Sequence, residues 1–444
     1  MNTTSQPGLV RGIRRWDLVA VALNGIIGAG IFGLPSKVFA LTGPYSMLAF
    51  VACAVFASLI ILCFAEVSSR FTETGGPYLY AREAFGFVAG FEVGWLMWLA
   101  RATAFAANLN LMLEYSTYFW PGISTGWTRA VVIIMIVATL TIINVVGVRD
   151  AAMFSDIFTV AKLIPIAFFI ITGLVFLNPQ NFSGAQQPSL SAFSQSVLLL
   201  VYAFTGFEMA LIPAGEVRDP QRNMPFALLT SLALVALVYI AIQAVCIGTL
   251  PGLATTTRPL ADAASHFLGT LGGSVITAGV IISITGNLSV LLLAAARLPF
   301  AMAGNRELPQ MFNRVHAKYR TPHIAIVATG AVMLALAMSG TFIYAVTIST
   351  IARLLAYIAT CIGMLILRRR NPEKPPFRAP AGAAVACTAL ILIIWLLAHS
   401  TGREARDAAI ATVTGLLIYG IYKLMNSKSK TKESSEYTLE AKES

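Results

Sequence analysis

Apolar segments long enough to cross a membrane follow one another along almost the whole chain. A helix needs roughly 20 apolar residues to span a hydrocarbon core about 30 Å thick. The pattern predicts about twelve such helices, separated by short polar connections. The expected spans are 17–40, 44–69, 87–118, 129–147, 152–176, 192–215, 226–250, 270–300, 322–340, 343–367, 382–399 and 407–425.

The composition indicates the same class of protein. Of the 444 residues, 57% are hydrophobic and 11% are charged, whereas soluble domains carry about 25% charged residues. The sequence therefore predicts an all-α polytopic membrane protein without a soluble domain. We expect a cytoplasmic N-terminal segment over 1–16, a transmembrane domain over 17–425 and a disordered cytoplasmic tail over 426–444.

The net charge of +11 is distributed unevenly. Lysine and arginine gather in alternate connections, such as 306–320 and 368–378, whereas the intervening connections carry few. This is the positive-inside pattern, which places both termini in the cytoplasm. We interpret the charge as orienting the chain in a plasma membrane, of the bacterial inner-membrane type, and expect no nucleic-acid partner. Residues 1–16 contain no signal-peptide core.

Other chemistries have no support in the sequence. The five cysteines form no CxxC pair and the four histidines have no ligand spacing, so we expect neither a disulfide nor a metal site. There is no GxSxG or phosphate-binding loop, which argues against an enzyme. There is no selectivity-filter pattern, which argues against a channel.

Two of the predicted helices are interrupted in the middle. The first contains NGIIGAGIF, with Gly25, Gly28 and Gly30, and the sixth contains VYAFTGFE, with Thr205 and Gly206. The breaks correspond if 17–176 and 192–367 are two halves, followed by two helices over 382–425. Breaks in matching places favour a transporter site built on inverted repeats. The alternative is that these glycines only allow close helix packing.

A broken helix exposes backbone groups that lipid cannot satisfy, so it must line a polar cavity or meet protein. Amides at a half-helix N-terminus attract a carboxylate, and freed carbonyls attract an ammonium group. Glycine lets a ligand reach the backbone because it has no Cβ. The breaks therefore predict a site for a small zwitterion.

Ionisable residues inside a membrane are functional candidates. Lys162 lies about a dozen residues into the fifth span, where it must find carbonyl partners or lose its proton. It is the first candidate for proton coupling, and a lysine that snorkels to the cytoplasmic surface is the alternative. Glu208, directly after the second break, is the second candidate. Its alternative is a protonated acid that only hydrogen-bonds the unwound backbone. Arg101 and Arg353 are also deep, and their roles are left open.

Four segments, GIIGAGIF, GGPYLYAREAFG, FTGFE and EVRDPQRNMP, occur in this order. Together they resemble the amino acid–polyamine–organocation (APC) transporter superfamily over about residues 14–425. The resemblance implies a leucine-transporter-like fold of two inverted five-helix repeats plus two helices, with helices 1 and 6 broken. It also implies secondary active transport of amino acids.

The resemblance further implies a substrate site. The substrate carboxylate would meet the amides of Ala29 and Gly30, and the ammonium group would meet carbonyls of Ile26, Tyr202 and Thr205. Side chains beside the breaks would shape the pocket or its gate. The implied substrate-binding set is Ile26, Ile27, Gly28, Ala29, Gly30, Tyr202, Phe204, Thr205, Gly206 and Phe207.

Lys162 matches the lysine that takes the place of sodium in some sodium-independent members. We therefore expect no sodium, no other cofactor, and the proton as coupling ion. Arginine/agmatine exchangers carry polar side chains where this chain has Gly25 and Ala29, and a tryptophan where it has Tyr202. This favours sodium-independent, proton-coupled symport of neutral L-amino acids by alternating access. The alternative is an amino acid exchanger on the same fold, including one for cationic amino acids. A partner subunit is left open.

Overall fold

The computed structural model describes residues 12–73, 75–147, 151–183, 186–371 and 373–443, without the side chains of 151–161 and 425–443. The described chain is built of helices, and its one strand-like pairing is a bridge between Ile13 and Val217. The α-helices are α1 Arg15–Ile26, α2 Ala29–Thr42, α3 Ser46–Ser68, α4 Gly76–Phe85, α5 Phe87–Ser116, α6 Gly126–Val146, α7 Ala151–Val175, α8 Leu190–Phe204, α9 Pro220–Thr249, α10 Pro259–Gly304, α11 His323–Ser339, α12 Phe342–Arg370, α13 Gly382–Ala398 and α14 Gly402–Glu443. The short 3-10 helices are η1 Gly43–Tyr45, η2 Pro179–Phe182, η3 Phe207–Leu211, η4 Ala214–Glu216, η5 Leu253–Thr255 and η6 Gln310–Asn313.

Many of these helices are long and apolar enough to cross a membrane. Seven segments of the described chain meet that requirement by length and composition, and α7, α11 and α13 contribute shorter apolar stretches. The long segments are Ala29–Ser68, Gly126–Val146, Leu190–Leu211, Pro220–Thr249, Pro259–Gly304, Phe342–Arg370 and Gly402–Leu424. The prediction of an all-α polytopic membrane protein is confirmed.

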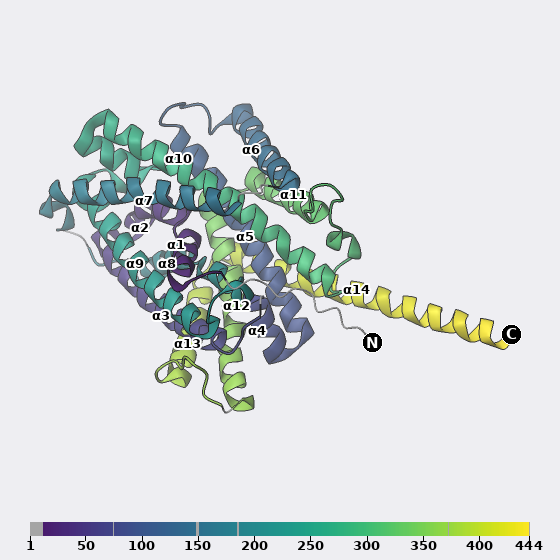
Figure 1. Cartoon of the computed structure of the whole chain (residues 1–444). Coiled ribbons are helices and arrows are strands. Elements are labelled where there is room, and N and C mark those ends of the chain that lie inside the picture. Colours follow the sequence, from purple (N-terminus) through teal and green to yellow (C-terminus); the bar gives the residue numbers. More distant parts are fainter. Residues whose placement is uncertain (1–11, 74, 148–150, 184–185, 372, 444) are drawn as a thin grey trace.

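The helix α5 is not among these long apolar segments, and it carries Arg101, Asn108 and Asn110, all of which are buried in protein. It runs through the middle of the molecule and packs against α10, α11 and α12 (Figure 1). Polar side chains are tolerated at membrane depth when they face the protein interior. The helix α5 is therefore the scaffold from which polar groups reach the centre.

The expected breaks are present in the first and sixth membrane segments. The first segment consists of α1 and α2, separated by Ile27 and Gly28, and the sixth consists of α8 and η3, separated by Thr205 and Gly206. The two segments lie together, with α1 against η3 and α2 against α8. At one end they are also joined by backbone hydrogen bonds, from Ile13 N to Glu216 O at 3.1 Å and from Arg218 N to Ile13 O at 2.9 Å.

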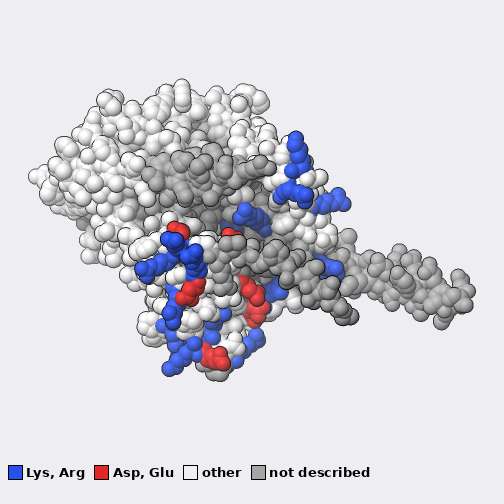
Figure 2. Space-filling view, viewed as in Figure 1, with Lys and Arg blue, Asp and Glu red and all other residues white. Residues whose placement is uncertain are grey.

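On the face shown in Figure 2, the charged side chains gather toward the lower and right-hand parts of the molecule, and the upper left part shows almost none. Glu66 of α3 is buried and accepts hydrogen bonds from α12 and from the connection after α12. Arg368 Nε donates to Glu66 Oε1 at 2.6 Å, and Ala379 N donates to Glu66 Oε2 at 2.9 Å. The distribution supports an integral membrane protein, and the cytoplasmic side of the termini stays a prediction.

The two ends of the chain fall largely outside the described side chains. Residues 1–11 of the expected N-terminal segment are not described. The backbone of α14 is helical through 426–443, where a disordered tail was expected, and its side chains after Leu424 lie outside the described residues. The character of this tail stays a prediction.

Candidate functional site

The first break leaves the N-terminus of α2 without a side-chain cap. Helix α1 ends at Ile26, and Ile27 (φ −74°, ψ 89°) and Gly28 (φ −127°, ψ −152°) are not helical. Gly28 is the N-cap of α2 and has no side chain that accepts from the first amides. These amides and the positive end of the helix dipole form a place that favours an anionic group.

The second break lies directly against the first. Gly206 has φ +105°, a left-handed conformation that glycine adopts without strain. A Cβ on Gly206 would lie 2.1 Å from the carbonyl oxygen of Gly25, and one on Gly25 would lie 2.5 Å from the carbonyl oxygen of Gly206. The backbones of the two broken helices therefore touch. These two glycines serve close packing as well as the break.

A cavity lies between the two breaks and the helices α5, α10 and α12. It is lined by Gly25, Ile26, Gly28, Gly30, Ala104, Asn108, Tyr202, Thr205, Gly206, Met209, Asn287, Leu291 and Arg353. The mixed polarity of this lining suits a small polar molecule. The breaks therefore line a polar cavity, which is the condition under which unwound backbone is tolerated at membrane depth.

The cavity contains six residues of the predicted substrate site: Ile26, Gly28, Gly30, Tyr202, Thr205 and Gly206. The predicted residues Ile27, Ala29, Phe204 and Phe207 are not in its lining. The Phe204 ring packs against Tyr239, with centroids 5.3 Å apart. The Phe207 ring packs against Phe64 and Tyr357, at 5.2 Å and 5.5 Å. The two phenylalanine rings thus point into packed helix contacts, and the role of these side chains in shaping the pocket or its gate stays a prediction.

A chain of hydrogen bonds that joins α10, α5 and α8 beside the cavity was not expected from the sequence. Asn287 Nδ2 of α10 donates to Asn108 Oδ1 of α5 at 2.9 Å. Asn108 Nδ2 in turn donates to the Tyr202 hydroxyl at 3.1 Å and to Ala104 O at 2.8 Å. These bonds occupy both amide protons of Asn108, whereas Asn287 keeps a second proton. A signal for Asn108 was available, since it is a carboxamide within an apolar span.

Carbonyl groups freed by the breaks already have partners in the protein. The Tyr239 hydroxyl lies 3.1 Å from both Ile26 O and Ala203 O. The Thr205 hydroxyl donates to Tyr202 O at 2.7 Å. A carbonyl oxygen has two lone pairs. Ile26 O therefore retains room for one more donor, whereas Tyr202 O also accepts from Thr205 N at 3.2 Å and has both lone pairs in use. The expected ammonium contact with Ile26 is compatible with this arrangement, and the contact with Tyr202 requires the Thr205 hydroxyl to turn away.

Lys162 lies beside the first break. Its Nζ donates to Asn24 O and Ile27 O, both at 3.1 Å, and the residue is 2% exposed. The alternative of a lysine that snorkels to the surface does not describe this side chain. Its terminal nitrogen instead donates hydrogen bonds to two carbonyls at the end of α1, where the helix dipole favours a positive charge.

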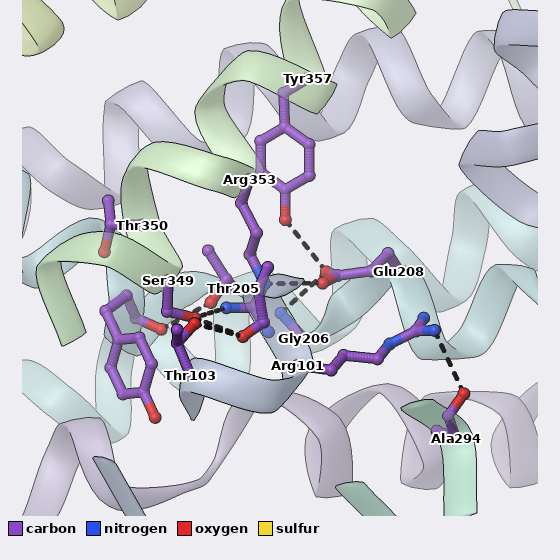
Figure 3. Close-up of polar contacts among 12 residues, drawn as sticks. Arg101, Thr103, Thr205, Gly206, Glu208, Ala294, Ser349, Thr350, Arg353 and Tyr357 are labelled. Carbon is purple, nitrogen blue, oxygen red and sulfur yellow. Dashed lines mark hydrogen bonds and ion pairs between the residues drawn. The ribbon is translucent and has the colours of Figure 1, made fainter. Parts of the chain in front are cut away.

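Glu208 is at the centre of a buried polar cluster (Figure 3). Its Oε1 accepts from Arg353 Nε at 2.9 Å, and its Oε2 accepts from the Tyr357 hydroxyl at 3.0 Å and from Gly206 N at 2.8 Å. The contact with the unwound backbone was one expected alternative, and the sequence left open which deep arginine would pair with Glu208. An arginine partner and two further donors favour the ionised carboxylate. This geometry favours a structural role for Glu208 over a proton-carrying role.

Comparison with known proteins agrees with the fold. The family model described as amino acid permease matches residues 13–420. The methylthioribose transporter of Bacillus subtilis is 28% identical, over 94% of this chain and 95% of the relative. The serine/threonine exchanger SteT of the same organism is 27% identical, over 94% and 98%. The b(0,+)-type amino acid transporter 1 of Mus musculus is 26% identical, over 95% and 89%.

The family match covers every membrane helix described above except the end of α14. It confirms the resemblance to the APC superfamily, and with the names of the relatives it identifies a transporter rather than an enzyme. The chain therefore belongs to the amino acid permease family, and it is an integral membrane transporter.

Proposed function

We propose that this protein is a sodium-independent symporter for amino acids with uncharged side chains. It couples their uptake to the entry of protons. The observation that carries the proposal is the contact of the Lys162 ammonium group with two carbonyls at the first break. A fixed ammonium supplies the positive charge that a sodium ion would supply in the same place. Gain or loss of a proton on this amine would then link the proton gradient to the conformation of the break.

The substrate proposal rests on the cavity. The uncapped N-terminus of α2 suits the α-carboxylate, and the carbonyl of Ile26 suits the α-ammonium. Ala104, Met209 and Leu291 are apolar parts of the lining, beside the Asn287 carboxamide. This combination suits a small or medium uncharged side chain.

Cationic substrates are disfavoured by the charges already present. Glu208 is committed to Arg353, so it offers no free carboxylate to a substrate cation. Arg101 is close enough to interact electrostatically with both of them. The local excess of positive charge would repel a lysine or arginine side chain.

The cavity is placed for alternating access. One wall is formed by the two broken helices and the other by α5, α10 and α12. Rocking of the first group against the second would open the cavity to one side of the membrane at a time. In the proposed cycle the amino acid and a proton enter from outside, and both leave on the cytoplasmic side.

Exchange on the same fold is the second candidate function. One relative is named a serine/threonine exchanger and covers almost the whole chain. Symport and exchange can share an identical binding site. They differ in whether the carrier can reorient across the membrane without bound substrate. In an exchanger, Lys162 would stabilise the first break without carrying a proton.

Uptake into proteoliposomes tests the proposed function. The purified protein is reconstituted in sodium-free buffer and given a panel of radiolabelled amino acids, with and without an inward proton gradient. Gradient-driven accumulation in empty vesicles supports symport. Uptake only into vesicles preloaded with amino acid supports exchange, and stimulation by sodium would contradict sodium independence.

The exchange of Lys162 for alanine tests the coupling role. We expect accumulation to fall to the level seen without a gradient, because the titratable amine is lost. The matched control is Lys423→Ala, since Lys423 is exposed on α14. Insertion of the protein is followed by its yield and elution profile in detergent. Normal gradient-driven accumulation by Lys162→Ala would contradict the role.

Two glycines of the first break are expected to respond differently to valine. A Cβ on Gly28 would lie 2.7 Å from Asn287 Nδ2, the movable end of a side chain, so Gly28→Val should fold but lose substrate binding. A Cβ on Gly30 would lie 2.7 Å from the Cα of Ala203, so Gly30→Val should damage the packing of α2 on α8. Substrate binding and thermal midpoint, measured together, separate the two. Gly420→Val is the control, since its Cβ meets nothing within 4 Å. Unchanged binding by Gly28→Val would argue against this cavity.

A further inference from the structure

The described side chains around the cavity carry more positive than negative charge. Arg101 and Arg353 are buried, and Glu208 is a buried carboxylate close to both. Lys162 is buried beside the first break. Glu208 is already paired with Arg353. Lys162 is held by two backbone carbonyls, whose dipoles partly compensate its charge. Arg101 has no ion pair among the described residues.

Arg101 is also poor in hydrogen bonds. A guanidinium has five N–H donors, and Arg101 makes a single bond, from Nη1 to Ala294 O at 3.4 Å. Its Nε is buried and has no partner in the structure, although the residue is only 2% exposed. Burial of an unpaired charge is strongly unfavourable, more so at membrane depth. Among the described residues, no carboxylate contacts this side chain directly.

The nearby carboxylate attracts Arg101 only at a distance. The two oxygens of Glu208 already accept from Arg353, Tyr357 and Gly206 N. Figure 3 shows the Arg101 guanidinium directed toward Ala294 of α10 and not into the pair between Glu208 and Arg353. The described residues therefore leave a place beside Arg101 for a further anion.

The place of Arg101 connects it to the substrate cavity. Arg101 lies one helical turn before Ala104 and two turns before Asn108, on the same face of α5, and both of these residues line the cavity. Its partner Ala294 lies one turn after Leu291, which also lines the cavity. Arg353 reaches the cavity from α12. An anion held by Arg101 would therefore lie at the edge of the cavity, at the end nearer α4.

We propose that Arg101, together with Arg353, binds a small monovalent anion at the edge of the substrate cavity. The planar fork of a guanidinium matches a carboxylate and also attracts a halide. Two sources share this chemistry: free chloride, or the side-chain carboxylate of an acidic amino acid in the cavity. The second source deepens the proposed function, since it would extend the substrate class to acidic amino acids. The first is independent of the substrate side chain.

Thermal stability of the purified protein in detergent tests the site without any transport step. A failure of the proposed proton coupling therefore does not affect the result. The first arm compares potassium chloride with potassium isethionate, a bulky sulfonate, at equal ionic strength. The second arm, in isethionate, compares L-glutamate with L-glutamine and L-aspartate with L-asparagine. Each arm is run on the unmodified protein, Arg101→Gln, Arg101→Lys and the control Arg222→Gln, whose side chain is 79% exposed.

We expect the anion to raise Tm by a few degrees when its concentration is about ten times its Kd. The shift should be the same in Arg222→Gln, smaller in Arg101→Lys and absent in Arg101→Gln. A shift with chloride identifies a free halide, and a shift with the acids beyond that with their amides identifies a substrate carboxylate.

The proposal is overturned if neither arm shifts Tm in the unmodified protein. It is also overturned if Arg101→Gln responds as strongly as the unmodified protein. If Arg101→Gln does not fold, the Tm shifts of Arg101→Lys and Arg222→Gln are compared instead. Lysine keeps the positive charge but lacks the planar guanidinium group. Equal shifts in those two variants would then place the anion elsewhere.

Discussion

Replacement of Gly206 by alanine is expected to abolish both folded protein and transport. The φ of +105° at this residue is strained for any residue with a Cβ. The new Cβ would lie 2.1 Å from the oxygen and 2.6 Å from the carbon of the Gly25 carbonyl. Backbone atoms in the middle of two packed helices cannot move aside as a side chain can. The whole contact between the two breaks must therefore separate.

The measurement is the yield of monodisperse protein in detergent, followed by uptake in proteoliposomes. Gly420→Ala is the control, since this glycine of α14 has ordinary φ and open space around its Cβ. Gly25→Ala, whose Cβ would lie 2.5 Å from Gly206 O, should reproduce the loss. Wild-type yield and uptake by Gly206→Ala would show that the two breaks do not pack against each other in the working transporter.

Removal of one partner from the buried pair of Glu208 and Arg353 is expected to have the second-largest effect. Both side chains are almost fully buried, so Glu208→Gln leaves an arginine, and Arg353→Gln leaves a carboxylate, without its counter-charge. Loss of one member of a buried pair typically costs about 3–5 kcal/mol. We expect each single variant to unfold at a clearly lower temperature and to lose transport, because Glu208 also holds the amide of Gly206.

The double variant Glu208→Gln with Arg353→Gln should recover part of the lost stability, because neither charge remains unpaired. Thermal unfolding of all four proteins gives the coupling energy of the pair. The control is the exposed pair Arg222 and Asp219, 3.9 Å apart, where loss of a partner should cost at most about 1 kcal/mol. If Glu208→Gln instead kept its stability and lost only proton coupling, Glu208 would be the proton carrier after all.

These two predictions differ in how much of them was visible in the sequence. Gly206 stands out there, because a glycine in the middle of an apolar helix weakens it and marks a break. Its contact with Gly25, 181 residues earlier, is visible only in the fold. The pair of Glu208 and Arg353 was harder still. Each residue was noticed as a charge at membrane depth, but which of several carboxylates and arginines would meet could not be predicted.

The lining of the cavity was also only partly predictable from the sequence. Ile26, Gly28, Gly30, Tyr202, Thr205 and Gly206 were predicted from their place in the two breaks, and they do line it. Phe204 and Phe207 were predicted on the same grounds, but their rings point into contacts with other helices. Asn108 and Asn287 complete the wall from helices that carried no break. Proximity to a break along the chain does not determine the direction of a side chain.

The sequence by itself determined the class of the protein, its succession of membrane helices, the two breaks and the depth of Lys162. Hydropathy, glycine content and charge placement are local properties of a segment. They determine locally whether that segment crosses the bilayer, because each helix must satisfy the hydrogen bonds of its own backbone. The tertiary structure alone decided which side chains face the cavity, which carbonyls hold Lys162, and that Arg353 rather than Arg101 takes Glu208. These outcomes depend on the packing of helices far apart in the sequence, which sets the distance and direction between groups that no local pattern relates.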